Sequence, residues 1–327
     1  MIKTEFYLPE NIIDSNLLQS DFESFDKEKF ENKIGINERY IVDEEESSLE
    51  LSIKSCKKLF ESFDKSKIDF IVYCTQTPKH ILPGNSSQLQ HELGLGSIPS
   101  FDFNLGCSGY VYGLSIAKAF IESGIANCVL LVTSDTYSKY INKKDKSNRS
   151  IFGDGSTSTI IDKSLSNNIG EFVLGTDGSK FQNLIIENGG GLKKSTCNPE
   201  LLKYGTDNFF TKNDLYMNGI EIFNFTIQLV PELVEKTLVK NNLDKNEIDY
   251  YIFHQANSFM LDYLRKKIKI PREKFYNDLK FSGNTVSSTI PIAINLSQQN
   301  GNIKKGDKVM LVGFGVGLSW GATILKI

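Results

Sequence analysis

Two stretches that lie 180 residues apart decide the fold: Asp64 to Gln76 reads DKSKIDFIVYCTQ, and Asp244 to Ala256 reads DKNEIDYYIFHQA. Each begins with a short charged lead and continues into β-branched and aromatic residues, which is typical of a buried strand. At the same offset, Cys128 to Thr133 (CVLLVT) matches Lys308 to Gly313 (KVMLVG). Two matches at one offset indicate two homologous halves. The alternative is a chance likeness between two ordinary strand–helix–strand units.

Each half also places a helical segment between its two strands. The segments Cys107 to Ser123 and Ser287 to Gln299 are each followed closely by glycine, a common helix-ending residue. Strands that read as continuous apolar runs and alternate with helices predict a parallel sheet covered on both faces. We therefore expect an α/β protein with an N-terminal half over residues 1–165 and a C-terminal half over residues 166–327.

Bulk composition excludes several classes of function. The 327 residues include 37 basic and 40 acidic side chains, so the chain lacks the positive charge that nucleic-acid or anionic-membrane binding needs. No apolar run is long enough to span a membrane, and Met1 to Glu10 does not resemble an export signal. The five cysteines are scattered without CxxC pairs, so neither a disulfide framework nor a metal site is expected. These features favour a cytoplasmic protein.

A candidate nucleophile lies in Asp102 to Leu114, which reads DFNLGCSGYVYGL. This stretch places Cys107 after a strand and at the expected start of a helix. Unpaired amides and the positive end of the helix dipole stabilise a thiolate there, which predicts a lowered pKa and a reactive sulfur. From this motif alone the alternative is a small buried hydrophobic side chain, the commoner role of a lone cysteine.

Two residues of the second half are expected to lie near this cysteine. His254, in the segment FHQAN, follows the second-half strand, and ligands bind at the carboxyl ends of strands in open α/β sheets. Asn284, in FSGNTVSSTIP, precedes the second-half helix and so corresponds to the surroundings of Cys107 in the repeat. The duplication therefore predicts these three side chains at one central face. Taken singly, the histidine could equally cap a loop and the asparagine could be a turn residue.

Five segments, in their order and spacing, resemble β-ketoacyl-ACP synthase III of the thiolase superfamily: DFNLGCSGYVYGL, IFGDGSTS, FHQAN, FSGNTVSSTIP and GFGVGLSWG. KIGINERY, at Lys33 to Tyr40, is similar to an early motif of the family, and the resemblance covers nearly the whole chain. It implies a five-layer αβαβα fold, a homodimer and a catalytic set of Cys107, His254 and Asn284. It also implies an oxyanion hole made by the backbone amides of Cys107 and Val316, although the family usually has glycine at the second position.

The resemblance further implies a two-step reaction without a permanently bound cofactor. Cys107 takes an acyl group from a coenzyme A thioester, and malonyl-ACP then loses carbon dioxide while His254 and Asn284 hold the enolate oxygen. The carbanion attacks the acyl-cysteine, so acyl carrier protein is an expected partner. The related hydroxymethylglutaryl-CoA synthase branch uses a glutamate after the first-half strand. Between Cys74 and His91 this chain has no carboxylate.

Several positions depart from the family pattern. Asn224 replaces a lysine, Phe259 replaces an arginine, and Lys27 to Lys33 (KEKFENK) lacks the family's tryptophan. Loss of positive charge weakens attraction to an acidic carrier protein. Leu82 aligns with the residue that, in the family, limits acyl-pocket depth from the neighbouring subunit. Two alternatives to the housekeeping condensing enzyme therefore stay open: a specialised paralogue in a secondary or glycan pathway, and a catalytically silent dimeric scaffold.

Overall fold

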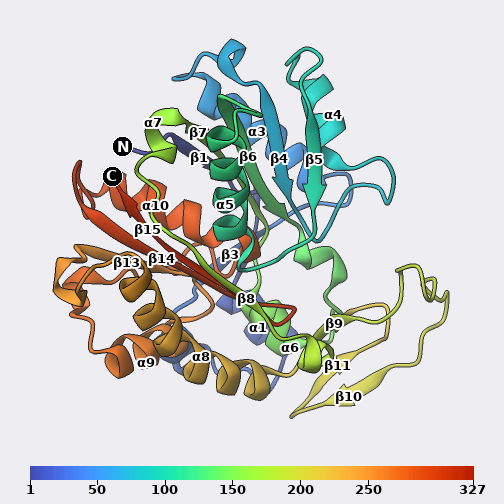
Figure 1. Cartoon of the computed structure of the whole chain (residues 1–327). Helices are drawn as coiled ribbons and strands as arrows, with labels where there is room; N and C mark the ends of the chain where they lie inside the picture. Colours follow the sequence, from blue (N-terminus) through green and yellow to red (C-terminus); the bar gives the residue numbers. More distant parts are fainter.

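Two β-sheets form the framework of the protein, in a computed structural model that describes residues 1–327 (Figure 1). The first sheet has the strand order β1-β7-β6-β4-β5. Its strands come from the first half of the chain: β1 (Thr4–Tyr7), β4 (Phe70–Cys74), β5 (Ser100–Phe103), β6 (Cys128–Asp135) and β7 (Gly155–Asp162). The pairs β4–β5 and β4–β6 are parallel, whereas β1 and β6 both pair antiparallel with β7.

The second sheet repeats this arrangement with the order β13-β14-β15-β8. Its strands come from the second half: β8 (Val173–Thr176), β13 (Tyr250–Phe253), β14 (Lys308–Gly315) and β15 (Ser319–Lys326). At the outer side of β13, where the first sheet has β5, a single parallel bridge joins Tyr251 to Phe275. The two sheets therefore differ mainly at that edge.

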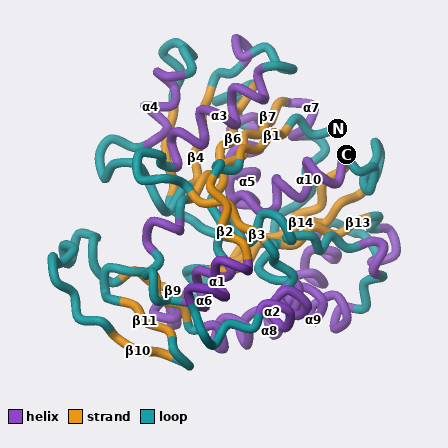
Figure 2. The backbone as a smooth tube through the Cα atoms, turned by 180° about the vertical axis from the view of Figure 1, so that it is seen from behind, coloured by secondary structure: helices purple, strands orange, loops and turns teal.

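Helices cover both outer faces and fill the space between the sheets. The outer face of the first sheet carries α3 (Ser48–Phe60) and α4 (Asn85–Glu92), whereas α8 (Gly219–Lys240) and α9 (Ser258–Ile268) lie on the second sheet's side. The central layer contains α5 (Gly109–Glu122) and α10 (Thr289–Gln299). Seen from behind, α3 and α4 lie at one end of the molecule and α8 and α9 at the other (Figure 2). This succession is the five-layer αβαβα fold that the family resemblance implied.

The central layer explains why its helices are so apolar. Eight residues of the 11-residue α10 are buried. A 23-residue core cluster fills the space around this layer and includes Val72 from the first sheet, Ile252 from the second and Ile290 from α10. Most of α10 has sheet on both sides and little contact with water, so its sequence loses the polar stripe of an ordinary surface helix.

The predicted duplication is confirmed by the elements themselves. Strand β4 and strand β13 begin at Phe70 and Tyr250, and helices α5 and α10 begin at Gly109 and Thr289, which preserves the offset of 180 residues. The proposed boundary at residue 165 falls in the short helix α7 (Lys163–Ser166), between the last strand of the first sheet and the first strand of the second. That boundary stays a prediction.

The remaining elements lie around this framework. They are β2 (Asn11–Asp14), α1 (Ser15–Asp21), α2 (Lys27–Ile34), β3 (Glu38–Ile41), α6 (Lys146–Ile151), β9 (Leu184–Ile186), β10 (Leu202–Tyr204), β11 (Asn208–Phe210) and β12 (Leu215–Met217). The last four form two small antiparallel pairs, and the segment that contains β10 and β11 projects from the body of the molecule (Figure 1). None of the helices combines the length and apolar composition that a membrane crossing requires.

Candidate active site

The three residues predicted for the site lie around one cavity. Cys107, His254 and Asn284 all line a space of about 110 Å³ and are only 6%, 2% and 5% exposed. Nine of the 14 lining residues are hydrophobic. The other members of the lining are Ile151, Phe152, Leu184, Met217, Gly219, Ile222, Ala256, Asn257, Met260, Phe314 and Gly315. The structure therefore brings the sequence-predicted set together in a small, mainly apolar space.

Cys107 occupies the turn between β5 and α5. Helix α5 begins at Gly109 with Ser108 as its N-cap, so the sulfur lies one residue before the cap. The end of β14 passes directly against it: a Cβ atom built on Gly315 would lie 2.8 Å from Cβ and 2.9 Å from Sγ of Cys107. Any side chain larger than that of glycine at position 315 would therefore displace the sulfur of Cys107.

The pKa of the Cys107 thiol is changed more by burial than by the start of helix α5. Burial raises its pKa to about 12, and the nearby carboxyl group of Asp135 acts in the same direction. The backbone amides of Val316 and of Cys107 itself donate toward the sulfur and lower the pKa, but by less. The expectation of a lowered pKa was therefore wrong, because desolvation of the thiolate outweighs the amides. A pKa near 12 keeps the thiol protonated at neutral pH.

His254 follows β13 and is fixed at two points. Its backbone N–H donates to the carbonyl of Val312 on β14 at 2.8 Å, and its Nδ1 lies 2.7 Å from Oγ1 of Thr289. The edge of the ring faces Phe314, with 5.6 Å between ring centroids. Burial lowers the pKa of the imidazole to about 3, because the charged form loses its hydration. His254 is therefore neutral across the physiological range.

Asn284 is positioned by the last residue of α6 and the segment that follows this helix. Its backbone N–H donates to Ile151 at 2.9 Å, and its carbonyl accepts from Gly153 at 3.0 Å. Its side-chain oxygen accepts the backbone N–H of Val286 at 2.9 Å, which settles the orientation of the amide. The side-chain NH₂ group is left as the donor of the carboxamide, on a residue that lines the cavity.

Val286 adopts a strained backbone conformation that makes this bond possible. Its φ of 56° lies in the left-handed region, which a β-branched residue rarely occupies. Such strain costs roughly 1–3 kcal/mol and persists only where the surrounding structure enforces it. Val286 is fully buried in a cluster that also contains Cys107 and Phe152, so the packing around the nucleophile holds the strained turn.

Asp135 is a buried group of this region that sequence analysis missed. It ends β6, and its carboxylate accepts the backbone N–H of Gln76 at 2.8 Å and the hydroxyl of Ser287. Burial raises its pKa to about 7. Because Ser287 directly follows Val286, this carboxylate connects the first sheet to the turn that carries Asn284. The available signal was an aspartate at the end of a continuous apolar strand.

Leu82, the residue predicted to limit the acyl pocket, does not line the cavity. Its side chain is 84% exposed and lies in the loop between β4 and α4, beside Ile81 at 85%. A contribution of Leu82 to an acyl pocket would require a second copy of the chain. That role stays a prediction.

Phe259, one of the positions that depart from the family pattern, belongs to an aromatic surface beside the cavity. Phe259 is 43% exposed, stacks on Phe223 at 5.7 Å between centroids, and has the ammonium group of Lys33 4.8 Å from its ring centroid. Asn224 is exposed on α8. Of the nearby basic side chains, Arg265 already bonds to the carbonyl of Ile270.

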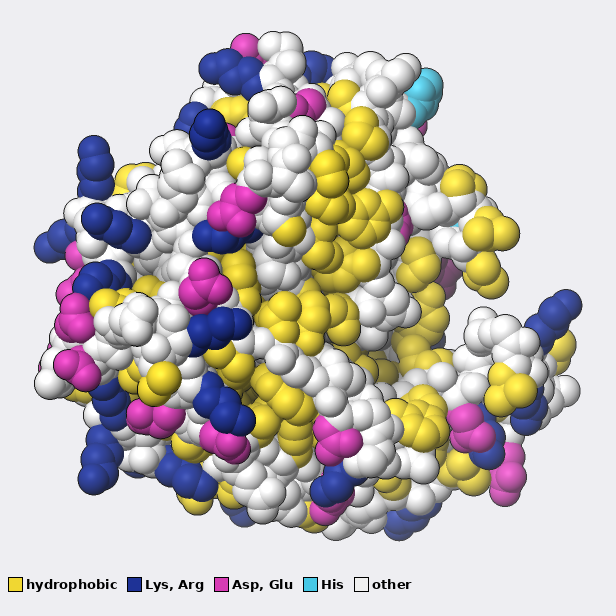
Figure 3. All heavy atoms as spheres, viewed as in Figure 1, with side chains coloured by type: hydrophobic (Ala, Val, Ile, Leu, Met, Phe, Trp, Pro, Cys, Tyr) yellow, Lys and Arg dark blue, Asp and Glu magenta, His cyan; other side chains and the backbone are white.

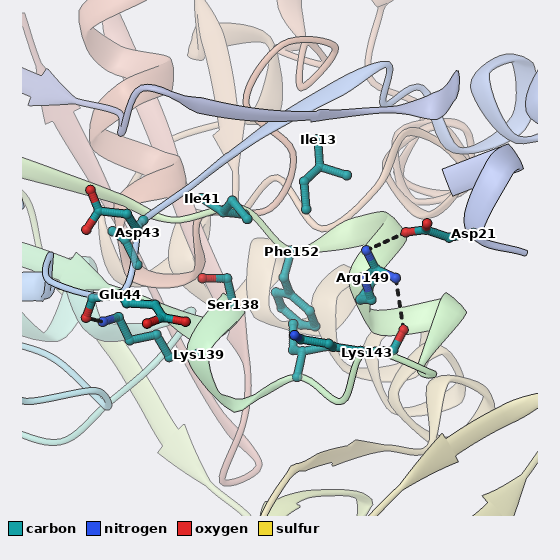
Figure 4. Close-up of a pocket in the computed structure, with 12 residues that line it drawn as sticks. Ile13, Asp21, Ile41, Asp43, Glu44, Ser138, Lys139, Lys143, Arg149 and Phe152 are labelled. Carbon is teal, nitrogen blue, oxygen red and sulfur yellow. Dashed lines mark hydrogen bonds and ion pairs between the residues drawn. The ribbon is translucent and has the colours of Figure 1, made fainter. Parts of the chain in front are cut away.

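A second, larger groove of about 970 Å³ lacks all three predicted residues (Figure 4). It shares only Phe152 with the smaller cavity. Its charged groups are mixed in sign, and Arg149 is already paired with Asp21 at 2.8 Å. Size alone therefore does not identify the reactive site of this protein.

Comparisons with known proteins agree with this fold and geometry. Residues 101–178 match the family described as 3-Oxoacyl-[acyl-carrier-protein (ACP)] synthase III, and residues 238–327 match its C-terminal family. A beta-ketoacyl-[acyl-carrier-protein] synthase III of Clostridium perfringens is 36% identical, with 100% of this chain and 98% of the relative covered. One from Trichodesmium erythraeum is 33% identical over 98% of this chain and 95% of the relative.

Solved structures give the same result. A crystal structure of a 3-oxoacyl-(acyl-carrier-protein) synthase III superposes with a TM-score of 0.96 at 40% identity, covering 99% of this chain and 98% of the other. The synthase III from Thermus thermophilus gives 0.87 at 28% identity, covering 99% and 98%. The fold and these likenesses define a thiolase-like condensing enzyme.

The chain belongs to the 3-oxoacyl-[acyl-carrier-protein] synthase III family. This membership makes it an acyltransferase of the condensing type and does not favour either a silent scaffold or a specialised paralogue.

Proposed function

We propose that this protein joins an acyl group, delivered as a coenzyme A thioester, to malonyl-ACP by decarboxylative condensation. The observation that carries the proposal is the convergence of Cys107, His254 and Asn284 on one apolar cavity, with the amides of Cys107 and Val316 directed at the sulfur. These groups supply a nucleophile, two neutral hydrogen-bond donors and an oxyanion hole.

In the first half-reaction, the sulfur of Cys107 attacks the thioester carbonyl carbon. The negative charge that develops on the carbonyl oxygen is held by the backbone amides of Cys107 and Val316. The thiol proton of Cys107 is transferred overall to the departing coenzyme A, which leaves as a free thiol. Because the resting thiol is protonated, this proton transfer is part of the step and not a preliminary ionisation.

In the second half-reaction, the carboxylate of malonyl-ACP leaves as carbon dioxide, and its electron pair becomes an enolate. The neutral ring of His254 and the NH₂ group of Asn284 donate hydrogen bonds to the enolate oxygen. The enolate carbon attacks the acyl carbonyl and the bond to sulfur breaks. The Cys107 thiolate that leaves takes up a proton from solvent water. The loss of carbon dioxide generates the carbanion, so no carboxylate base is needed.

The burial of His254 suits this role. A cationic imidazole would attract and stabilise the malonyl carboxylate, the group whose loss drives the step. Because burial keeps the pKa near 3, the ring donates a hydrogen bond without that charge. The apolar lining also strengthens each hydrogen bond in the cavity by excluding water.

Acyl carrier protein is the proposed partner at the surface beside the cavity. Carrier proteins that are acidic would be attracted by Lys33. Phe259, stacked on Phe223, offers apolar contact where the family pattern has an arginine. We expect association to depend less on salt than it would with an arginine at position 259.

A homodimer is also part of the proposal. Strand β5 lies at the edge of the first sheet, where its outer backbone groups have no neighbouring strand. Figure 3 shows hydrophobic side chains gathered over β5 and α5 and on the loop that projects beside these elements. Phe101 and Phe103 belong to β5, and Phe120 belongs to α5. Ile81 and Leu82 on that loop are almost fully exposed in a single chain. A second copy at this edge would cover these groups.

Intact-mass measurement tests the nucleophile. After incubation with acetyl-CoA and other acyl thioesters, the wild-type chain should gain one acyl group, and Cys107→Ala should gain none. Cys197→Ala is the matched control, because Cys197 is an exposed cysteine outside the cavity. An adduct that persists in Cys107→Ala, or no adduct from any donor, would contradict the proposal.

A second measurement separates the half-reactions. His254→Ala should lose malonyl-ACP decarboxylation by about 100-fold or more, the usual effect of removing one oxyanion donor. Acyl loading, which uses the amides and not the ring, should fall much less. Equal loss of both steps would show that the division of labour is wrong.

A further inference from the structure

We propose that Thr289 is a positioning residue that fixes which nitrogen of His254 carries the proton. Thr289 is the first residue of α10, is 3% exposed, and does not line the cavity. Its hydroxyl oxygen lies 2.7 Å from Nδ1 of His254 and 3.2 Å from the carbonyl oxygen of Val286. The inference deepens the proposed function, because it concerns the donor that the second half-reaction requires.

A neutral imidazole has one N–H, so its two nitrogens cannot both donate. Nδ1 of His254 is held by Thr289. The nitrogen available to substrate is therefore Nε2. To hold an enolate oxygen, Nε2 must carry the proton and Nδ1 must be an acceptor. The partner of Nδ1 then has to be a donor.

The hydroxyl of Thr289 has one proton and two neighbouring acceptors. If it donates to Val286, the ring must donate from Nδ1, and Nε2 is left as a bare acceptor that repels an enolate oxygen. If it donates to Nδ1, Nε2–H faces the reaction and the Val286 carbonyl loses its partner. The distance of 2.7 Å between Nδ1 and Oγ1 fits donation in either direction, and the 3.2 Å contact to Val286 is the longer of the two. We assign the donation to Nδ1, because the second half-reaction needs Nε2–H.

The surroundings of His254 disfavour the doubly protonated ring, in which both nitrogens would donate. Burial lowers the pKa of His254 to about 3, so protonation of both nitrogens is unfavourable at neutral pH. The ring of Phe314, 5.6 Å away between centroids, has no hydrogen-bonding group. The tautomer is thus decided by one hydroxyl, as a second partner often decides the tautomer of a functional histidine.

Nitrogen-15 NMR of histidine-labelled protein reads the tautomer directly. The chain has only three histidines, and His80 and His91 are exposed, so His254→Ala identifies the signals of His254. We expect Nε2–H in the wild-type chain and a shift toward Nδ1–H, or a mixture, in Thr289→Val. Nδ1–H in the wild-type chain would overturn the proposal.

The kinetic test compares three variants. Thr289→Val should slow malonyl-ACP decarboxylation by about 10- to 100-fold, the range found when the hydrogen-bond partner of a metal-bound histidine is removed. Acyl loading of Cys107 should change by less than about threefold, and Thr289→Ser should restore decarboxylation. Thr285→Val is the matched control, because the hydroxyl of Thr285 is buried without a partner.

The outcomes separate this inference from the proposed function. Decarboxylation at the wild-type rate in Thr289→Val, or failure of the serine variant to rescue it, would refute the positioning role. A wild-type chain that never decarboxylates malonyl-ACP would refute the proposed function instead, whereas the NMR result would still test the tautomer.

Discussion

Replacing Gly315 with alanine should block the nucleophile without removing any catalytic group. The new methyl carbon would lie 2.8 Å from Cβ and 2.9 Å from Sγ of Cys107. Carbon contacts are most favourable at about 3.5–4.0 Å, so either the sulfur or strand β14 must move by roughly 0.6–1.2 Å. Overpacking of this size costs about 1–3 kcal/mol of stability. A displacement near 1 Å in a reacting group can cost about 100-fold in rate.

The assay is the time course of acyl adduct formation on Cys107, followed by intact mass with acetyl-CoA as donor. Gly315→Ala should load about 100-fold more slowly than wild type. Gly178→Ala is the control, because a Cβ there meets nothing within 4 Å. Thermal unfolding of each variant shows whether the chain is folded at the assay temperature. Wild-type loading by a folded Gly315→Ala would refute the claim that β14 sets the position of the sulfur.

Three further predictions concern other parts of the molecule. Asn284→Ala should slow malonyl-ACP decarboxylation by about 100-fold or more through loss of one donor, with acyl loading much less affected. Burial raises the pKa of Asp135 from 3.8 to about 7. Between these two pH values the native state binds one proton more than the unfolded state, so the free energy of unfolding falls as pH rises from about 4 to about 7. Urea unfolding should accordingly show Asp135→Asn gaining stability relative to wild type between pH 5 and pH 8; an unchanged difference would contradict the shift. Leu82→Asp should weaken the proposed dimer by about tenfold or more in sedimentation equilibrium, whereas Val239→Asp, at a 75% exposed position on α8, should not.

The architecture was predictable because it depends on patterns that repeat along the chain. The strand at Phe70–Cys74 and the strand at Tyr250–Phe253 carry the same apolar signature, and the offset between them places the helices as well. Cys107, His254 and Asn284 were predictable as a set because each follows a strand or precedes a helix of that repeat. Their roles rest on the proposed mechanism.

The supporting groups were not predictable, since they depend on contacts between distant segments. Nothing local marks Thr289 as the partner of His254, which lies 35 residues away, or Ser287 as the partner of Asp135, which lies 152 residues away. The pKa of Cys107 was predicted in the wrong direction for the same reason. A helix start is visible in a sequence, but the degree to which the folded chain removes water from a sulfur is not.

The division of the site between the two halves has a consequence for how activity is acquired. Cys107 belongs to the half that forms the first sheet, whereas His254 and Asn284 belong to the half that forms the second sheet. Neither half alone therefore contains all three catalytic residues. Catalytic activity should therefore return during refolding only when the two halves have packed against each other. Fragments separated near Lys163 should be inert singly and recover turnover only when mixed.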